Sequence, residues 1–428
     1  MNGIIRRWLT GTRNPGKSAY IWNTVSAMEN SFQTMGLLLV LTRLHNMEDS
    51  AIFAIAYAVG NLWIALGKYG IRHFQVTDVK EKYSYEEYLG MRYFSCFFMF
   101  IACLIYVGVG KMGGYTWYKA ACVMLACLIK LVDAFEDVLH GRLQQKEKLH
   151  IAGKVLSLRL FLYITAFVIL YAVTGNLLIT LLFSFLFTLM LAVYLNGLVR
   201  EELERNEERK LSYPKIWALM VESLPLCVSF FLNTYLFNAP KYLIDELVND
   251  EVQSCFNVVF MPVFVISLLS NFIFQPMLHK SAVLWEKKEY TKFHRIIMKQ
   301  TAIIICLTLI ADAGGWLLGV PVLGWIFDVK LDDYRFLMVL LISSGGISAF
   351  INFMHMVLTT LRKQNILLSS YLLTSAAMLF IGGYVMRHYG LQAMTVIFLG
   401  LLFLLALILL AAYMVVSGRR RVEIKREL

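Results

Sequence analysis

The stretches NTVSAMENSFQT (residues 23–34) and AIAYAVGNLWIALGKYGIR (residues 54–72) decide how this chain folds. At about 100° per residue, the first stretch places its polar residues on one side of a helix: Asn23, Ser26, Glu29, Asn30, Gln33 and Thr34. The second carries alanines at spacings of three and four, followed by Asn61, Lys68 and Arg72. Polar groups in hydrocarbon must face a bundle interior or water. The two helices therefore predict one wall of an aqueous, partly basic cavity inside a membrane protein.

The composition excludes an ordinary soluble domain. Of 428 residues, 59% are hydrophobic and 16% charged, against roughly 25% charged in soluble proteins. The formal net charge of +11 comes from short basic blocks between apolar runs, so nucleic-acid binding is not expected. The seven cysteines are scattered singly, which favours packing roles over a zinc site or a disulfide framework.

The hydropathy pattern predicts an all-α, polytopic protein with twelve membrane-spanning helices. A span needs about 20 mostly apolar residues. Candidates are centred near residues 31, 59, 99, 128, 163, 188, 226, 265, 312, 347, 375 and 404. Most lysines and arginines fall in the N-terminal tail, the C-terminal tail and the loops after even-numbered spans. The positive-inside rule therefore places both termini in the cytoplasm.

A polar stretch divides the chain almost in half. REELERNEERKLSYPK (200–215) predicts a cytoplasmic linker over 200–213, between an N-terminal six-helix lobe (1–199) and a C-terminal one (214–428). A weak internal repeat supports two lobes, because VLHGRLQQKEKL (138–149) resembles VLTTLRKQNILL (357–368). Repeats of even helix number share one orientation in the membrane.

Several acidic residues lie within the predicted spans. Lys130, Asp133, Glu136, Asp137 and His140 share one sector of the fourth helix, which fits either a proton relay or an internal ion-pair cluster. Glu29, Glu222 and Asp312 lack a partner in their own helices. Together with Asp133 they are candidates for coupling to a proton or a sodium ion, unless they pair with Lys68, Arg159 or Lys130 across the bundle.

Basic residues at helix ends are the candidate substrate-binding groups. Lys68 and Arg72 fit an anionic ligand, because ammonium and guanidinium groups bind phosphate well; the alternative is ordinary anchoring at a helix end. Arg43 and Lys241 occupy similar positions after the first and seventh helices. The predicted neutral lining of the cavity consists of Asn30, Gln33, Asn61, Asn233 and Asn257.

No motif predicts catalysis, a metal site or a cofactor. GTRNPGKS (11–18) matches the phosphate-loop pattern, but that loop requires a buried strand before it and a parallel sheet around it. Here only ten residues precede it and a membrane span follows. Lys17 and Arg13 are instead expected to act as cytoplasmic anchors.

The chain resembles the polysaccharide and O-antigen lipid flippases of the multidrug/oligosaccharidyl-lipid/polysaccharide exporter superfamily. The resemblance spans nearly the full length and rests on the order of short motifs around the spans: LTRL (41–44), GIRHFQ (70–75), HGRLQQ (140–145), NAPKYLI (238–244), FNVVFMP (256–262), LRKQ (361–364) and HYGLQA (388–393). It implies two six-helix lobes in a V, a central cavity lined by the first, second, seventh and eighth helices, and alternating access.

The resemblance also implies a substrate. Such flippases move undecaprenyl-diphosphate-linked oligosaccharides to the outer leaflet of the plasma membrane, where a polysaccharide polymerase takes over. The superfamily's cavity cations match Lys68 and Arg72, and by position Arg43 and Lys241. Membrane lipids and a coupling ion are the other expected partners.

Two other functions compete with this one. A drug or cation antiporter of the same superfamily would favour an acidic, aromatic pocket, against which the basic end of the second helix argues. A membrane polysaccharide polymerase or ligase, which belongs to another class, would require a large outer loop bearing catalytic groups, and the sequence has none. A peptidoglycan-precursor flippase commonly carries additional helices beyond twelve.

Overall fold

The chain folds as helices in two compact units. The computed structural model describes residues 2–43, 47–112, 114–203, 212–247, 256, 258–260, 262–263, 266, 274–327 and 331–427. These residues form helices and turns and contain no strand, which agrees with the predicted all-α class. The units are Met1–Cys227 and Val228–Leu428.

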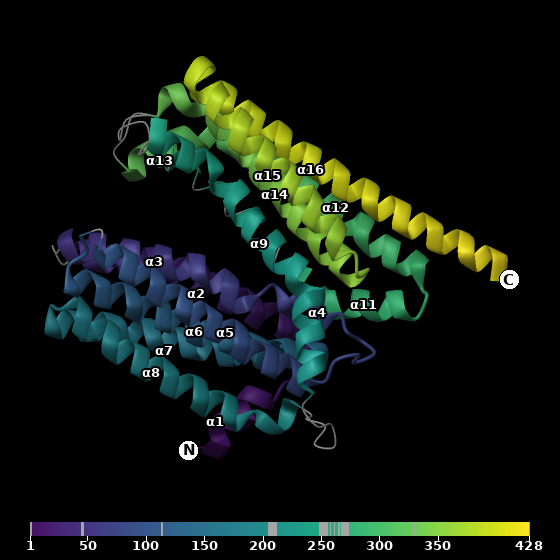
Figure 1. The fold of residues 1–428 in the computed structure, drawn as a ribbon, viewed down its shortest axis with the longest axis horizontal. Coiled ribbons are helices and arrows are strands. Elements are labelled where there is room, and N and C mark those ends of the chain that lie inside the picture. The colour runs from purple at the N-terminus through teal and green to yellow at the C-terminus, as the bar shows by residue number, and fades with distance from the viewer. Residues whose placement is uncertain are drawn as a thin grey trace. The chain divides into compact units, whose positions relative to one another are not determined.

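The N-terminal unit is a bundle in which α2, α3, α5, α6, α7 and α8 run side by side (Figure 1). Its core contains Leu37, Phe53, Met99, Val123 and Phe167, which are buried and in mutual contact as one cluster. The elements are α1 (Asn2–Thr10), α2 (Pro15–Arg43), α3 (Met47–Lys68), α4 (Ile71–Val76), α5 (Tyr85–Met112), α6 (Trp117–Gln145), α7 (Leu149–Thr174), α8 (Leu177–Leu198), the 3₁₀ turn η1 (Arg200–Leu203) and the beginning of α9 (Tyr213–Leu247).

The phosphate-loop match forms the start of a helix. A helix, α1, precedes it where a phosphate loop requires a strand. The Asn14 side chain accepts a hydrogen bond from the Lys17 amide at 3.0 Å, and Pro15 is the first residue of α2. Both are standard signals for a helix N-terminus. The rejection of the nucleotide-binding interpretation is therefore consistent with the structure.

A break between α3 and α4 separates Lys68 from Arg72. Tyr69 and Gly70 have left-handed backbones, with φ of 53° and 62°. A side chain at Gly70 would place its Cβ 3.3 Å from the Leu226 carbonyl oxygen, so only glycine fits this crossing without adjustment. The helical spacing between Lys68 and Arg72 is therefore interrupted, although the charges of both residues act on Asp137.

Eight segments of the described residues are long and apolar enough to cross a membrane. They include α5, α7, α8 and all of α14 (Arg335–Thr360). α2 and α6, each of 29 residues, also have the length of a span but carry the polar residues discussed above. The predicted span centred near residue 265 falls mostly outside the described residues.

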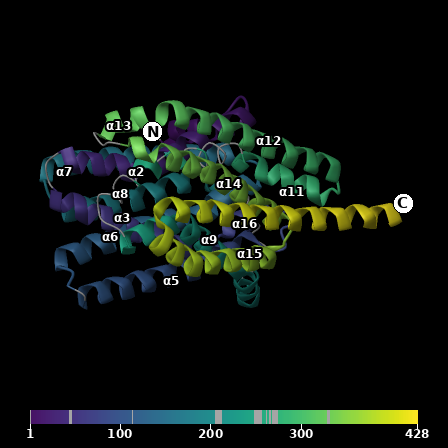
Figure 2. The ribbon, with the colours of Figure 1, turned by 90° about the horizontal axis from the view of Figure 1, so that it is seen from above.

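The C-terminal unit contains the rest of α9 and a second set of helices. Its further elements are η2 (Gln275–Met277), α11 (Leu278–Glu286), α12 (Tyr290–Gly314), the π-turn η3 (Gly315–Gly319), α13 (Val320–Phe327), η4 (Asp332–Tyr334), α14, α15 (Gln364–Ala377), the π-turn η5 (Met378–Gly382) and α16 (Gly383–Glu427). α14 packs against both α12 and α16. α16 is 45 residues long and extends beyond α12, α14 and α15 at its C-terminal end (Figures 1 and 2).

The spans predicted near residues 375 and 404 are two segments that meet at Gly390. The backbone of Gly390 (φ 80°, ψ −173°) is not helical and lies in a region that essentially only glycine adopts. α15, η5 and the first turns of α16 therefore form one segment, and the remainder of α16 forms the next.

The boundary between the compact units lies inside a helix. The predicted linker is described only at Arg200–Leu203, which forms η1, and at residues 212–213, because residues 204–211 lie outside the description. The units divide between Cys227 and Val228, within α9 and two residues after Pro225. A proline inside a helix removes one backbone hydrogen bond and weakens the helix locally.

Candidate functional site

The first two long helices present polar side chains at their surface. Asn30 on α2 and Asn61 on α3 are exposed, and Glu29 and Thr34 are half-buried. Gln33 is buried and donates a hydrogen bond to the Asn30 side chain at 3.4 Å. Because an exposed amide in a helix of membrane length is unfavourable against lipid, this surface is suited to water or to a polar ligand.

Lys68 and Arg72 lie on either side of the α3–α4 break. Arg72 donates from Nη1 to Asp137 Oδ1 at 3.3 Å and from Nε to Gln144 Oε1 at 3.2 Å, and its side chain is 22% exposed. Lys68, the last residue of α3, is half-buried. It forms no ion pair or hydrogen bond with the part of the chain that the structure describes. Its charge nevertheless acts on Asp137 from beyond ion-pair distance.

Asp137 is shared by two arginines. Its second oxygen, Oδ2, lies 3.2 Å from Nη2 of Arg92, whose side chain is fully buried. Arg92 also donates to the Gly67 carbonyl oxygen, which accepts a further hydrogen bond from Ser95 at 2.8 Å. Arg72, Arg92 and Asp137 form what we term the Asp137 triad. Its formal charge is positive, because two guanidinium groups share a single carboxylate.

A second buried cluster is neutral. Lys130, Asp133, Glu136 and Arg159 form what we term the Asp133 quartet, whose side chains are at most 10% exposed. Asp133 is paired with Lys130 at 3.2 Å and with Arg159 at 2.6 Å, and Arg159 Nε lies 2.7 Å from Glu136. These contacts are the ones expected of an internal ion-pair cluster. They do not test whether Asp133 takes part in ion coupling.

Neighbouring helices complete the hydrogen bonding of the quartet. Thr188 on α8 accepts a hydrogen bond from Arg159 at 2.8 Å, and Asn196 on the same helix donates to Glu136 at 2.6 Å. The hydroxyl groups of Tyr57 and Tyr163 are hydrogen-bonded to each other, and the Lys130 ammonium lies 5.2 Å from the centre of the Tyr57 ring. Buried charges are tolerated when they are paired and hydrogen-bonded in this way.

Positive charge is thus concentrated at one end of the buried network. The Asp133 quartet balances two cations against two carboxylates, whereas the Asp137 triad has one cation in excess and Lys68 adds another nearby. A net positive charge in a low-dielectric region favours an anionic ligand. The triad and Lys68 are therefore the candidate site.

The other three predicted coupling carboxylates, Glu29, Glu222 and Asp312, have different surroundings. Glu222 on α9 accepts hydrogen bonds from Lys82 Nζ at 2.7 Å and from the Tyr83 hydroxyl at 2.6 Å. These partners differ from the cations that the sequence suggested, which were Lys68, Arg159 and Lys130. Asp312 accepts a hydrogen bond from Ser343 at 3.0 Å. Glu29 Oε2 and Asp312 Oδ1 are buried and have no hydrogen-bond partner among the described residues. Buried unsatisfied carboxylate oxygens are unusual and require an explanation.

The loop 77–84 forms ion pairs and hydrogen bonds both with the C-terminal end of α6 and with the first half of α9. Glu81 pairs with Arg142 at 3.0 Å and with Lys146 at 2.8 Å. Burial acts to raise the pKa of Glu81, but the hydrogen bonds and charges of Lys146 and Arg142 outweigh it and lower that pKa overall. Burial and the hydrogen bond to Glu222 raise the pKa of Tyr83, which therefore remains a donor at neutral pH.

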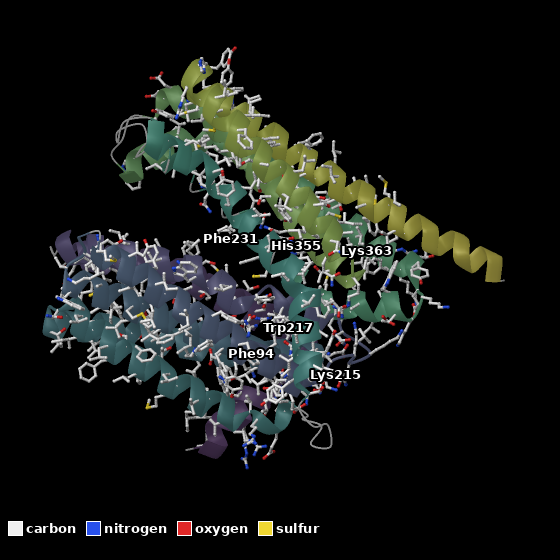
Figure 3. The ribbon with its side chains drawn as sticks, in the orientation of Figure 1. Phe94, Lys215, Trp217, Phe231, His355 and Lys363 are labelled. Atoms are coloured by element: carbon white, nitrogen blue, oxygen red, sulfur yellow. The ribbon has the colours of Figure 1, made fainter. Side chains whose placement is uncertain are left out.

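A further ion pair holds the beginning of α9 to the N-terminal unit. Lys215 (Figure 3) lies 3.6 Å from Glu87, and the Tyr69 hydroxyl donates to the Met220 carbonyl oxygen at 3.4 Å. With the Glu222 contacts, these interactions explain why the first half of α9 belongs to the N-terminal compact unit.

The remaining predicted lining residues are only partly located. Asn233, in the C-terminal unit, donates to Asn352 at 3.0 Å. Arg43 is the last residue of α2 and Lys241 lies on α9, but their side chains are outside the described part of the structure, as is Asn257 altogether. Sequence reasoning missed Arg92 and Gln144. An arginine in the first third of the apolar helix α5 was the available signal for Arg92.

Metal binding is not indicated in the described residues, which contain no group of three or more histidine, cysteine or acidic side chains placed to hold a metal ion.

Comparisons with known proteins identify the fold. No family model matches the chain. The capsular polysaccharide biosynthesis protein CapF of Staphylococcus aureus is 23% identical over 313 residues, which cover 71% of this chain and 76% of CapF. A solved MATE structure in the bent conformation superimposes with a TM-score of 0.75 at 11% identity and covers 98% of each chain.

Two further solved structures agree. An outward-facing MATE multidrug resistance transporter of the MOP superfamily has a TM-score of 0.71 at 12% identity, over 96% of this chain and 98% of its own. A MOP-superfamily transporter from Pyrococcus furiosus, described as having a binding pocket of reverse polarity that suggests a different function, has a TM-score of 0.68 at 11% identity, over 97% and 98%. The chain therefore has the fold of the MATE transporters, which have twelve transmembrane helices in two lobes, and is an integral multi-pass membrane protein.

Proposed function

We propose that this chain is a flippase that moves an undecaprenyl-diphosphate-linked oligosaccharide from the cytoplasmic to the outer leaflet of the plasma membrane. Transport proceeds by alternating access and supplies cell-surface polysaccharide synthesis, where a polymerase acts on the product. The observation that carries the proposal is the excess of positive charge formed by Lys68 and the Asp137 triad in helices that cross the membrane.

A diphosphate is the ligand chemistry that this charge fits best. Guanidinium groups bind phosphate oxygens through two parallel hydrogen bonds, and an ammonium group adds a compact positive charge. Such pairing is much stronger in a low-dielectric cavity than in water. The exposed amides of Asn30 and Asn61 offer hydrogen bonds to sugar hydroxyls.

Two of the similar proteins support this choice. CapF is named for capsular polysaccharide biosynthesis. The Pyrococcus furiosus transporter shows that a binding pocket of reversed polarity occurs on this fold. A basic site in place of one for cationic drugs is therefore compatible with the architecture.

We assign ion coupling to Glu29 and Asp312, each of which has a buried carboxylate oxygen without a hydrogen-bond partner among the described residues. Such an oxygen is available to a proton or a sodium ion. Glu29→Gln and Asp312→Asn should each reduce the dependence of transport on an imposed proton or sodium gradient. Transport that keeps its full gradient dependence in both variants would exclude these two residues from coupling.

Charge deletion at the site tests the flippase proposal. Lys68→Ala and Arg72→Ala should abolish complementation of a flippase-deficient strain while the protein reaches the membrane at near-normal levels. Arg72→Lys should restore only part of the function, because lysine cannot make the paired contacts of a guanidinium. Lys17→Ala, which removes an exposed lysine outside the network, is the matched control.

The accumulated product distinguishes the proposal from a folding defect. Cells carrying either alanine variant should accumulate lipid-linked oligosaccharide in the cytoplasmic leaflet, whereas Lys17→Ala cells should not. Parental rates of polysaccharide export in both alanine variants would refute a phosphate-bearing substrate.

The second candidate function is cation-coupled antiport of a drug or another small molecule. It is favoured by the MATE fold together with the unpartnered oxygens of Glu29 and Asp312. If that function is correct, expression of the chain should raise resistance to cationic compounds, and Lys68→Ala should leave the resistance unchanged.

A further inference from the structure

The two arginines bound to Asp137 differ in how firmly they are held. Arg92 is fully buried and is also fixed by the Gly67 carbonyl oxygen. The Arg72 side chain is 22% exposed. Among the described residues it pairs with Asp137 and donates one hydrogen bond to the neutral Gln144. Arg72 can therefore leave Asp137 more easily than Arg92 can.

Sharing one carboxylate between two arginines has a specific consequence. If Arg72 turns toward a ligand, Asp137 keeps its contact with Arg92 at 3.2 Å and is not left as an isolated buried charge. A carboxylate with Arg72 as its sole partner would be stranded by the same movement, which is strongly unfavourable in a protein interior. The triad thus allows Arg72 to exchange anions without leaving a buried charge unpaired.

We propose that Asp137 is an internal counter-anion that holds Arg72 while the site is empty and gives it up to the diphosphate of the lipid substrate. The inference rests on the proposed function and assigns Asp137 a positioning role within it. Because the carboxylate competes with the substrate for the same guanidinium, it lowers the affinity and permits release at the outer leaflet. A site of excess positive charge without such a competitor would retain a dianionic ligand.

Gln144 has the same role in weaker form. Its side-chain oxygen accepts the Arg72 Nε–H at 3.2 Å, so it occupies a donor that two-point phosphate binding can use. Since Gln144 is neutral, removing it loosens Arg72 without changing the charge of the site. It therefore provides a second way to test the competition.

The experiment measures binding of inorganic pyrophosphate to the purified full-length protein in detergent by titration calorimetry. Asp137→Asn should bind pyrophosphate about tenfold more tightly than the parent protein, because Arg72 no longer has an internal anion. In an Arg72→Ala background the same substitution should tighten binding about threefold or less, because it then removes a negative charge near Lys68 but frees no guanidinium. A merely structural role of Asp137 would not make its effect depend on Arg72.

The transport rate should change in the opposite direction to the binding affinity. Asp137→Asn should export polysaccharide more slowly than the parent despite its tighter binding, since release is impaired. Gln144→Ala should tighten pyrophosphate binding about threefold. If Asp137→Asn fails to fold, the binding measurement on Gln144→Ala tests the inference instead. Unchanged or weaker binding in the folded variants, or an equal gain without Arg72, would overturn the inference.

Failure of the proposed function gives a different result. If neither the parent nor any variant binds pyrophosphate, the diphosphate substrate is excluded, and the role of Asp137 is excluded with it. If the parent binds in a Lys68-dependent manner but Asp137→Asn has no effect, the flippase proposal stands and this inference alone is wrong.

Discussion

Replacement of Arg159 by methionine tests whether the Asp133 quartet is a structural ion-pair cluster. The substitution removes a guanidinium that contacts Asp133 at 2.6 Å, Glu136 at 2.7 Å and Thr188 at 2.8 Å. The site is 98% buried, so water cannot replace the lost contacts. Methionine preserves an unbranched chain in the space, which makes loss of charge the main effect.

The expected magnitude follows from the charges that are left behind. Removing one partner of a buried ion pair destabilises a protein by about 3–5 kcal/mol. In a unit the size of Met1–Cys227, roughly 2–4 °C of melting temperature is lost per kcal/mol. Arg159→Met should therefore lower the melting temperature of the N-terminal unit by roughly 6–20 °C.

A thiol-reactive fluorescent dye can follow the unfolding of this unit. Four buried cysteines lie in the α5 and α6 helices of its core and become reactive on unfolding: Cys96, Cys103, Cys122 and Cys127. The exposed Cys306, as well as Cys255, is first replaced by serine. Arg7→Met, which removes an exposed arginine of α1, should melt with the parent protein and serves as the control.

A charge-balanced double variant makes the test specific. Arg159→Met combined with Glu136→Gln leaves the neutral Lys130–Asp133 pair, so part of the lost stability should return. A melting temperature of Arg159→Met within about 2 °C of the parent, or a double variant no more stable than the single one, would refute the structural interpretation.

Three further predictions concern the N-terminal unit. Glu81→Gln should lower the melting temperature at neutral pH, and the difference should close in acid. A carboxylate whose pKa is lowered by folding stabilises the fold above its unfolded pKa of about 4.3 and loses this effect as the pH falls through the folded value. Glu222→Gln should destabilise the fold while gradient-dependent transport persists, because its partner Lys82 serves to hold α9; lost ion dependence in vesicles would contradict this. Gly153→Ala should cost about 1–3 kcal/mol in thermal unfolding, since its Cβ would lie 2.8 Å from the backbone carbonyl carbon of Trp22, which cannot move as a side-chain end can.

The all-helical fold could be predicted because it depends on composition and hydropathy alone. The ion pairs within the fourth predicted helix were also accessible, since Lys130 and Asp133 are three residues apart and face the same way. Arg159 was identified as an available partner by its position inside a span. In each case the pattern lies within one helix or follows from the exclusion of charge from lipid.

The geometry of the candidate site could not be predicted, because it depends on contacts between distant segments. Gly70 is left-handed where it meets the Leu226 carbonyl oxygen, and no local pattern in the sequence marks that crossing. The break redirects Arg72 toward Asp137 and Gln144. The partner of Arg92 lies on another helix, so its role is visible only once α5 and α6 are packed together.

The division of α9 between the two compact units limits where the chain can be divided into two polypeptides. The polar stretch 200–215 is the obvious place to cut the chain into two polypeptides, yet such a cut separates Glu222 from Lys82 and Tyr83, its partners in the N-terminal unit. The first fragment would lack a helix that covers it, and the second would begin with half a helix that has lost its neighbours. The two halves of the sequence are therefore not interchangeable modules. α9 supplies residues to both compact units, so each unit has all of its residues only when α9 is continuous.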